Sequence, residues 1–180
     1  IFLTNDGRVT ARIFDGIARI LTSSATISAQ AWTHIAITGN GSEFRLYING
    51  LLNGSIPAGF AISDYSTPEL ILGLAAQTTT NFAGQINDVR MIDRVLNESE
   101  IAAASGMVFT ISASAGAGGT INPSGNISVP VLSNSTYTIS PSTGYHISDV
   151  LADNVSVGPV SSYTFTSVTA NHSISAVFAQ

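Results

Sequence analysis

The stretch "WTHIAITGNGSEFRLYING", residues 32–50, decides the fold because it reads as two strands joined by a tight turn. Apolar and polar residues alternate on both sides of Asn40-Gly41, and a period of two is typical of a β-strand with one buried face. Asn-Gly favours a hairpin turn, since both residues tolerate a positive φ. A second pair, Asn49-Gly50, follows at once, so the stretch predicts an antiparallel meander.

The return strand of this hairpin carries side chains of two kinds. Phe44, Leu46 and Ile48 alternate with Arg45 and Tyr47. Successive residues of a strand point to opposite sides of the sheet, so we expect one apolar face against a core and one mixed face. The stretch is therefore predicted to form a wall of a domain, and the pattern leaves open what the mixed face meets.

Strand patterns extend over the rest of the first half. Two strands are predicted on either side of Asp15-Gly16, and residues 70–73 predict a short buried strand. Residues 82–93, "FAGQINDVRMID", predict a long strand whose alternation slips near residues 87–88, as a β-bulge would make it do.

One helix is predicted at the end of this half, in "NESEIAAAS", residues 97–105. Asn97 is a good N-cap, Glu100 stands where a capping-box partner belongs, and Gly106 ends the pattern. A helix of about two turns is marginal by itself, so we expect it to dock on the sheet.

The composition changes near Met107, where the chain becomes rich in Gly, Ala and Ser. From Val108 onward, short strand patterns are separated by turn residues at regular spacing, including Asn122-Pro123. We therefore expect an all-β protein with two domains, residues 1–106 and residues 107–180.

Composition and charge exclude several classes of partner. The net charge is −5, the 6 basic residues are all Arg, and none lies beyond Arg94. A second half without cations cannot neutralise phosphates, which disfavours nucleic acid and anionic membrane surfaces. No apolar run approaches the roughly 18 residues of a membrane helix, so membrane insertion is not expected. The absence of Cys removes disulfides and thiolate metal sites.

Two resemblances can now be stated. Residues 32–101 resemble the C-terminal half of a laminin-G-like, concanavalin A-like jelly-roll domain, which we take to extend over residues 1–105. The matching features, in order, are "WTHIAIT", "FRLYINGLLNGS", "LILG", "FAGQINDVRMIDRVL" and "NESEIAAA". Residues 108–180 resemble the divergent internalin-type B-repeat modules of bacterial surface proteins, through "GGTINPSG", "YTISPSTGYHISDVLADNVSVG" and "SYTFTSVTANHSISAVFA".

These resemblances imply a partial jelly-roll sandwich with one short C-terminal helix, followed by a small β-rich, β-grasp-like repeat module. Relatives of the first domain begin with strands that would lie upstream of Ile1, and the strand at 82–93 normally pairs beside them. Residues 1–106 are therefore expected to supply only part of the sandwich. The opening strands would come from sequence upstream of Ile1, or another chain would donate them, or this version of the fold is trimmed.

Trp32 and the pair Asn87-Asp88 are the residues with the clearest alternative interpretations. Trp32, the only tryptophan, could stack on a sugar ring, but the resemblance and the alternation favour a core position. Relatives often bind calcium near the last long strand, which makes Asp88 and Asn87 the metal candidates, although Asn87 replaces the first of two acids. No cofactor is established by the sequence, and calcium is the one candidate. Asp6 and Asp64 are expected to be turn residues first and metal ligands only second.

Catalytic machinery is not evident. His34, His146 and His172 are far apart, no Ser lies in a G-x-S-x-G context, and glycosidases of this fold pair their acids on one strand. Asp88 and Asp93 would point to opposite faces of the predicted strand, so they do not form such a pair. Glu98 and Glu100 belong to a predicted helix cap. We expect no enzyme and no catalytic residues.

The expected function is an extracellular binding or adhesion module of a bacterial surface or secreted protein, or of a virion surface. The jelly roll would recognise a glycan or a cell-surface protein, and the second domain would be a spacer. The alternative is a structural subunit of a fibre, filament or phage tail, completed by strands from copies of itself. A third hypothesis is an accessory part of a larger secreted hydrolase.

Overall fold

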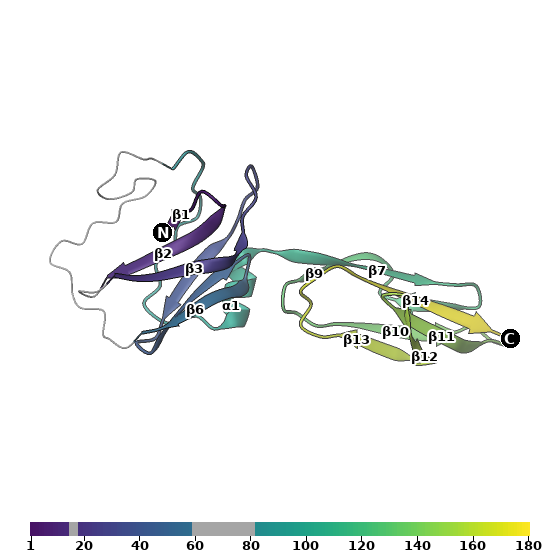
Figure 1. The fold of residues 1–180 in the computed structure, drawn as a ribbon. Helices are drawn as coiled ribbons and strands as arrows, with labels where there is room; N and C mark the ends of the chain where they lie inside the picture. The colour runs from purple at the N-terminus through teal and green to yellow at the C-terminus, as the bar shows by residue number, and fades with distance from the viewer. Residues whose placement is uncertain (15–17, 59–81) are drawn as a thin grey trace. The chain divides into compact units, whose positions relative to one another are not determined.

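The computed structural model describes residues 1–14, 18–58 and 82–180, so the strand predicted at 70–73 and Asp64 lie outside the described residues. The described chain forms strands in four sheets and one short helix, which confirms the expected all-β class (Figure 1). It divides into two compact units, Ile1–Ile101 and Ala102–Gln180. The predicted domain boundary between residues 106 and 107 lies slightly further along the chain and stays a prediction.

The first unit contains two antiparallel sheets of three strands each. Their strands are β1 (Phe2–Leu3), β2 (Arg8–Phe14) and β3 (Ala18–Thr26), and β4 (Ile35–Gly39), β5 (Glu43–Ile48) and β6 (Leu51–Pro57). Both sheets contribute to one core, because apolar residues alternate along their strands. The buried members are Val9, Ala11, Leu21, Phe44, Leu46, Ile48 and Ala58.

The meander predicted from residues 32–50 is confirmed. β4 pairs with β5 up to the contact between Gly39 and Phe44, and β5 pairs with β6 from Ile48 and Leu51 onward. Asn49 and Gly50 join β5 to β6 with φ values of 50° and 82°, the conformation that a two-residue type I′ turn requires.

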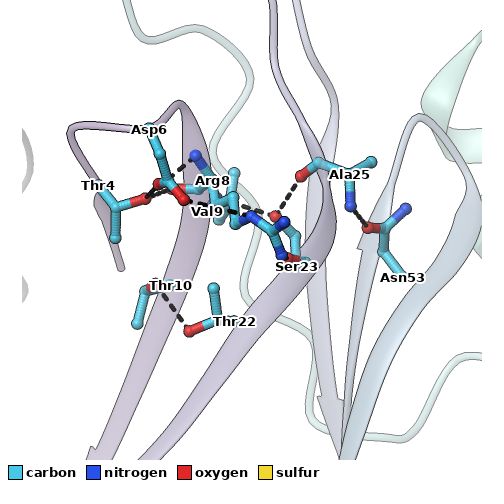
Figure 2. A network of polar contacts seen from close by, with 9 residues as sticks. All are labelled: Thr4, Asp6, Arg8, Val9, Thr10, Thr22, Ser23, Ala25 and Asn53. Atoms are coloured by element: carbon cyan, nitrogen blue, oxygen red, sulfur yellow. Dashed lines mark hydrogen bonds and ion pairs between the residues drawn. The ribbon is translucent and has the colours of Figure 1, made fainter.

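Polar contacts link β2, β3 and β6 within the first unit (Figure 2). The register between β2 and β3 shifts between Arg8 and Thr10, so the Val9 N–H has no strand carbonyl to meet. The Ser23 hydroxyl accepts this N–H at 3.0 Å and donates to the Ala25 carbonyl at 2.6 Å. The Asn53 side chain on β6 then accepts the Ala25 N–H at 2.8 Å, linking the second sheet to the first.

Two predictions on this unit are wrong. Residues 82–93 form no strand: they run as irregular, exposed chain, with the Met91 side chain 81% exposed. A strand needs a neighbour for its backbone N–H and C=O groups, and none of the described strands pairs with this segment, which leaves no ladder for the predicted bulge. Trp32 is not a core residue either, since it is 66% exposed in the loop before β4 begins at Ile35.

The predicted helix is confirmed as α1 (Glu98–Ser105), the single helix of the described residues. Asn97 Oδ1 accepts the Glu100 N–H at 2.9 Å, and Glu100 Oε2 accepts the Asn97 N–H at 2.9 Å, as in a capping box. Gly106 follows with a φ of 63°, the left-handed conformation that commonly ends a helix.

The second unit encloses one core between two sheets. One sheet has the strand order β13-β10-β8, and the other has β12-β11-β14-β7-β9, in which β7 and β14 are parallel. The expected β-rich character is confirmed, but a β-grasp would lay a helix across its sheet, whereas residues 107–180 form strands and turns only. The strands are β7 (Val108–Ala115), β8 (Gly119–Asn122), β9 (Gly125–Pro130), β10 (Ser135–Pro141), β11 (His146–Ala152), β12 (Val155–Gly158), β13 (Ser162–Phe165) and β14 (His172–Ala179).

Replacing Ser23 tests the polar network of Figure 2. Ser23→Ala removes the acceptor of the buried Val9 N–H, so we expect the free energy of unfolding to fall by about 1–3 kcal/mol, the cost of an unsatisfied buried donor. Urea denaturation followed by circular dichroism measures it. The control is Ser24→Ala, because Ser24 makes an exposed hydrogen bond to Asn53. Equal stabilities of the two variants would contradict the assignment.

The cap of α1 predicts a pH dependence. Hydrogen bonds from Arg94, and then from the Asn97 backbone, lower the pKa of Glu100 from 4.5 to about 2. A carboxylate with a lowered folded-state pKa contributes stability above its unfolded pKa and loses it as pH falls through the folded one. The stability lost in Glu100→Gln should therefore be constant above about pH 5 and vanish as pH falls from 4.5 to about 2. Thermal unfolding across this range measures it, and a pH-independent difference would contradict it.

Candidate functional site

A groove of about 580 Å³ lies on the first unit, between the outer face of β4–β5 and the segment that leads into α1. The outer face of the sheet is its floor, and residues 95–99 are its wall. Both come from sequence regions that are about fifty residues apart, so only the folded chain makes the groove. Its lining residues are Thr38, Asn40, Glu43, Arg45, Tyr47, Val95, Leu96, Asn97, Glu98 and Ser99.

The alternation of β5 determines which side chains reach this groove. Phe44, Leu46 and Ile48 point into the core, so the residues between them point the other way. Tyr47 is only 2% exposed and forms a closed part of the floor, whereas the Arg45 side chain is 40% exposed. The mixed face that the sequence predicted is therefore the floor of the groove.

Arg45, a lining residue of the groove, is held by three neighbours. Its Nε donates to Glu43 Oε2 at 2.7 Å, and its Nη1 donates to Glu98 Oε1 at 3.4 Å. The hydrogen bond to Glu43, and then a hydrogen bond to the Tyr47 side chain, raise the pKa of Arg45. A guanidinium has five N–H donors in one plane, so these contacts fix its orientation and leave donors that face the groove.

The same contacts keep Glu43 ionised. Hydrogen bonds from Arg45 and then from Ser55 lower the pKa of Glu43 below its ordinary value. A carboxylate that holds its charge in this way accepts hydrogen bonds and is a poor proton donor at neutral pH.

Two asparagines, Asn40 and Asn97, add donors to the groove lining. Asn40 Oδ1 accepts the N–H groups of Ser42 and Glu43, at 2.9 Å and 2.8 Å, in the β4–β5 turn. Asn97 Oδ1 accepts from the Glu100 N–H and from the Ser99 hydroxyl. Since both amide oxygens are used by turn and cap, the Nδ2 groups of both residues remain as donors.

The groove offers a polar ligand both hydrogen-bond donors and hydrogen-bond acceptors. The Arg45 guanidinium and two amide groups donate, while Glu43 and Glu98 accept. Such a set, on a rigid sheet floor, fits a ligand that carries many hydroxyl groups.

The predicted metal residues Asn87 and Asp88 lie apart from the groove lining, in the exposed chain of residues 82–93. Asp88 has a positive φ of 54°, and its two carboxylate oxygens accept from Arg90 Nε and Nη2 at 2.8 Å and 2.9 Å. The described residues contain no group of three or more His, Asp or Glu side chains that could hold a metal. The two carboxylate oxygens of Asp88 suit the guanidinium of Arg90, whereas calcium prefers six to eight oxygen ligands. The calcium hypothesis stays untested.

The three histidines are not brought together. His34 is half-buried: burial lowers its pKa, the charge of Asp88 opposes this and that of Arg90 adds to it. In the second unit, His172 Nδ1 lies 2.7 Å from Asp153 Oδ2, while His146 is exposed at the start of β11. Asp6 lies in the turn before β2, bonded to Thr4 and ion-paired with Arg8, as expected of a turn residue.

The sequence pattern predicts where several of the groove residues lie, but it does not indicate a site. Arg45 was placed on the mixed face of a strand, and Asn97 and Glu98 were assigned to a helix cap. The one available signal was the outward order Glu43, Arg45, Tyr47 at alternate positions, which puts a charged pair and a hydroxyl side by side.

Similarity to known proteins is found in structure and in family. None of the described helices is long and apolar enough to cross a membrane. No curated protein sequence matches the chain. The crystal structure of a fragment of an S-layer domain-containing protein from Clostridium thermocellum is similar, with 21% identity and a TM-score of 0.41. The similarity covers 58% of this chain and 66% of that one, so this chain spans just under two thirds of its length.

A family match is more extensive. Residues 1–102 match the family described as the concanavalin A-like lectin/glucanases superfamily, as the resemblance of the first domain implied. The resemblance of residues 108–180 to B-repeat modules stays a prediction. The matched residues contain β1 to β6 and the start of α1. Because the match covers more than half of the chain, the chain belongs to the concanavalin A-like lectin/glucanases superfamily.

Proposed function

We propose that this chain is an extracellular recognition module, secreted or displayed on a surface, that binds a glycan in the groove on β5. The single observation that carries the proposal is the Arg45 guanidinium, which lines the groove, is held by Glu43, Glu98 and Tyr47, and belongs to a side chain that is 40% exposed. A donor whose orientation is set before binding loses little conformational freedom when a ligand arrives. The second unit serves as a spacer.

The proposal is binding without catalysis. Glycoside hydrolysis needs one carboxylic acid that is protonated and one carboxylate that is not. Glu43 is held ionised by Arg45 and Ser55, so it is unsuited to the role of the acid. An incubated oligosaccharide should therefore remain intact.

Arg45→Met tests the site. It keeps much of the side-chain length but removes every donor, so we expect glycan binding to weaken by about tenfold or more, the effect of losing a charged hydrogen bond. Isothermal titration with the best glycan from a broad array measures it. The matched control, Arg12→Met, removes an exposed arginine of β2 and should bind as the natural chain does.

Two results would contradict the proposal. One is an array with no bound glycan, in calcium and in EDTA alike. The other is an Arg45→Met variant that folds normally by circular dichroism and binds unchanged. The EDTA arm, repeated with Asp88→Ala, also tests the calcium hypothesis.

A second function, a structural subunit that assembles with copies of itself, is favoured by one observation. Large apolar side chains are exposed along residues 82–95, a segment with the composition of a strand. An exposed segment that pairs with none of the described strands is a ready surface for another chain. The side chains are Phe82, Ile86, Val89, Met91, Ile92 and Val95.

Native mass spectrometry tests this second function. Self-assembly predicts dimers or larger species, and slowed amide hydrogen exchange at residues 82–95 within them. Met91→Glu should shift the distribution toward monomer, because it places a charge at the contact. A folded monomer at all concentrations would contradict self-assembly and leave the glycan proposal standing.

A further inference from the structure

We infer that the groove on β5 selects neutral saccharides and rejects anionic ones, and that Glu98 is the residue that sets this selectivity. The inference rests on the proposed function and goes beyond it, because a glycan site could as well be built for sulfated or uronate sugars. It depends on the charges that line the groove and on how each of them is held.

The groove carries two carboxylates and one guanidinium, so its lining has one net negative charge. Arg45 is the only cation among the lining residues, and both acids lie against it, Glu43 at 2.7 Å and Glu98 at 3.4 Å. An anionic ligand that approached Arg45 would meet both carboxylates within a few ångströms. Repulsion between like charges at such distances opposes binding, and the neutralised guanidinium offers little attraction in return.

The two carboxylates have different roles. Glu43 is held on two sides, by Arg45 and by Ser55, and its side chain is only 29% exposed. Glu98 makes the longer contact with Arg45, and its side chain is 53% exposed. Glu43 therefore positions the guanidinium, while Glu98 is the carboxylate that an incoming ligand meets.

The capping box of α1 keeps Glu98 in this place. Asn97 and Glu100 hold each other's backbone N–H groups on either side of Glu98. Glu100 itself pairs with Arg94, at 2.8 Å and 2.9 Å, and is not part of the groove lining. The helix thus carries two carboxylates with different roles: Glu98 lines the groove, and Glu100 holds the start of the helix that positions Glu98.

The hydrogen-bonding groups of the groove lining also suit a neutral ligand. A sugar hydroxyl both donates and accepts, so it can satisfy the donors of Arg45, Asn40 and Asn97 together with the free acceptor positions of Glu98. A sulfate or carboxylate only accepts and would leave Glu98 facing another anion. Neutral sugars with adjacent hydroxyl groups are therefore the class that this lining fits.

The test uses polysaccharide pairs that share a backbone and differ in charge. Dextran is compared with dextran sulfate, and hydroxyethyl cellulose with carboxymethyl cellulose, by affinity electrophoresis of the full chain. About 0.15 M NaCl limits the Debye length to about 8 Å, so that charges in the groove outweigh the net charge of the chain. The readout is the ratio of the two affinities within each pair.

We expect the natural chain to favour the neutral member of a pair by about tenfold or more. Glu98→Gln should reduce this ratio at least severalfold, because the amide keeps the shape and removes the charge. Asp93→Asn removes an exposed carboxylate that is not part of the groove lining, and it should leave the ratio unchanged. Tighter binding of the anionic members, or an unchanged ratio in a folded Glu98→Gln variant, would overturn the inference while leaving glycan binding intact. Binding to none of these polysaccharides, nor to a glycan array, would overturn the proposed function and this inference with it.

Discussion

The rest of the structure depends on the two faces of β5. Six consecutive residues, Glu43–Ile48, give three side chains to the core and three to the groove. Because the period of a strand is two, the faces cannot be changed independently: a shift of one residue in register would bury Arg45 and expose Leu46. The core that stabilises the first unit therefore also fixes the position of the guanidinium on which the proposed site is built.

The second constraint is the contact that Arg45 makes across the groove with Glu98. An ion pair between exposed side chains adds little to stability. Here the ion pair matters because it fixes the position of the helix relative to the sheet: it connects the floor of the groove to a helix about fifty residues further along the chain. The capping box gives this helix a defined start, so the wall of the groove has a defined position too.

The sequence predicted the parts of the fold that depend on neighbouring residues. Asn49-Gly50, the alternation of β5 and the Asn97–Glu100 cap were all read correctly, since turns, strand faces and caps are decided within a few residues. The predictions were wrong where the local structure depends on residues that are distant in the sequence. The pattern of residues 82–93 fits a strand, but no described strand pairs with it, and Trp32 lies in a loop that its alternation did not reveal. The groove was missed for the same reason, because Arg45 and Glu98 meet only in the folded chain.

The most direct measurement of this account is the hydrogen exchange of the Arg45 side chain, followed by NMR at its Nε–Hε group with Arg12 as the reference. A guanidinium whose Nε–Hε is bonded to Glu43 at 2.7 Å should exchange more slowly than the exposed Arg12, by about tenfold, and its signal should shift when a bound glycan is added. An Arg45 signal that exchanges as fast as that of Arg12, and that a bound glycan does not move, would contradict the account.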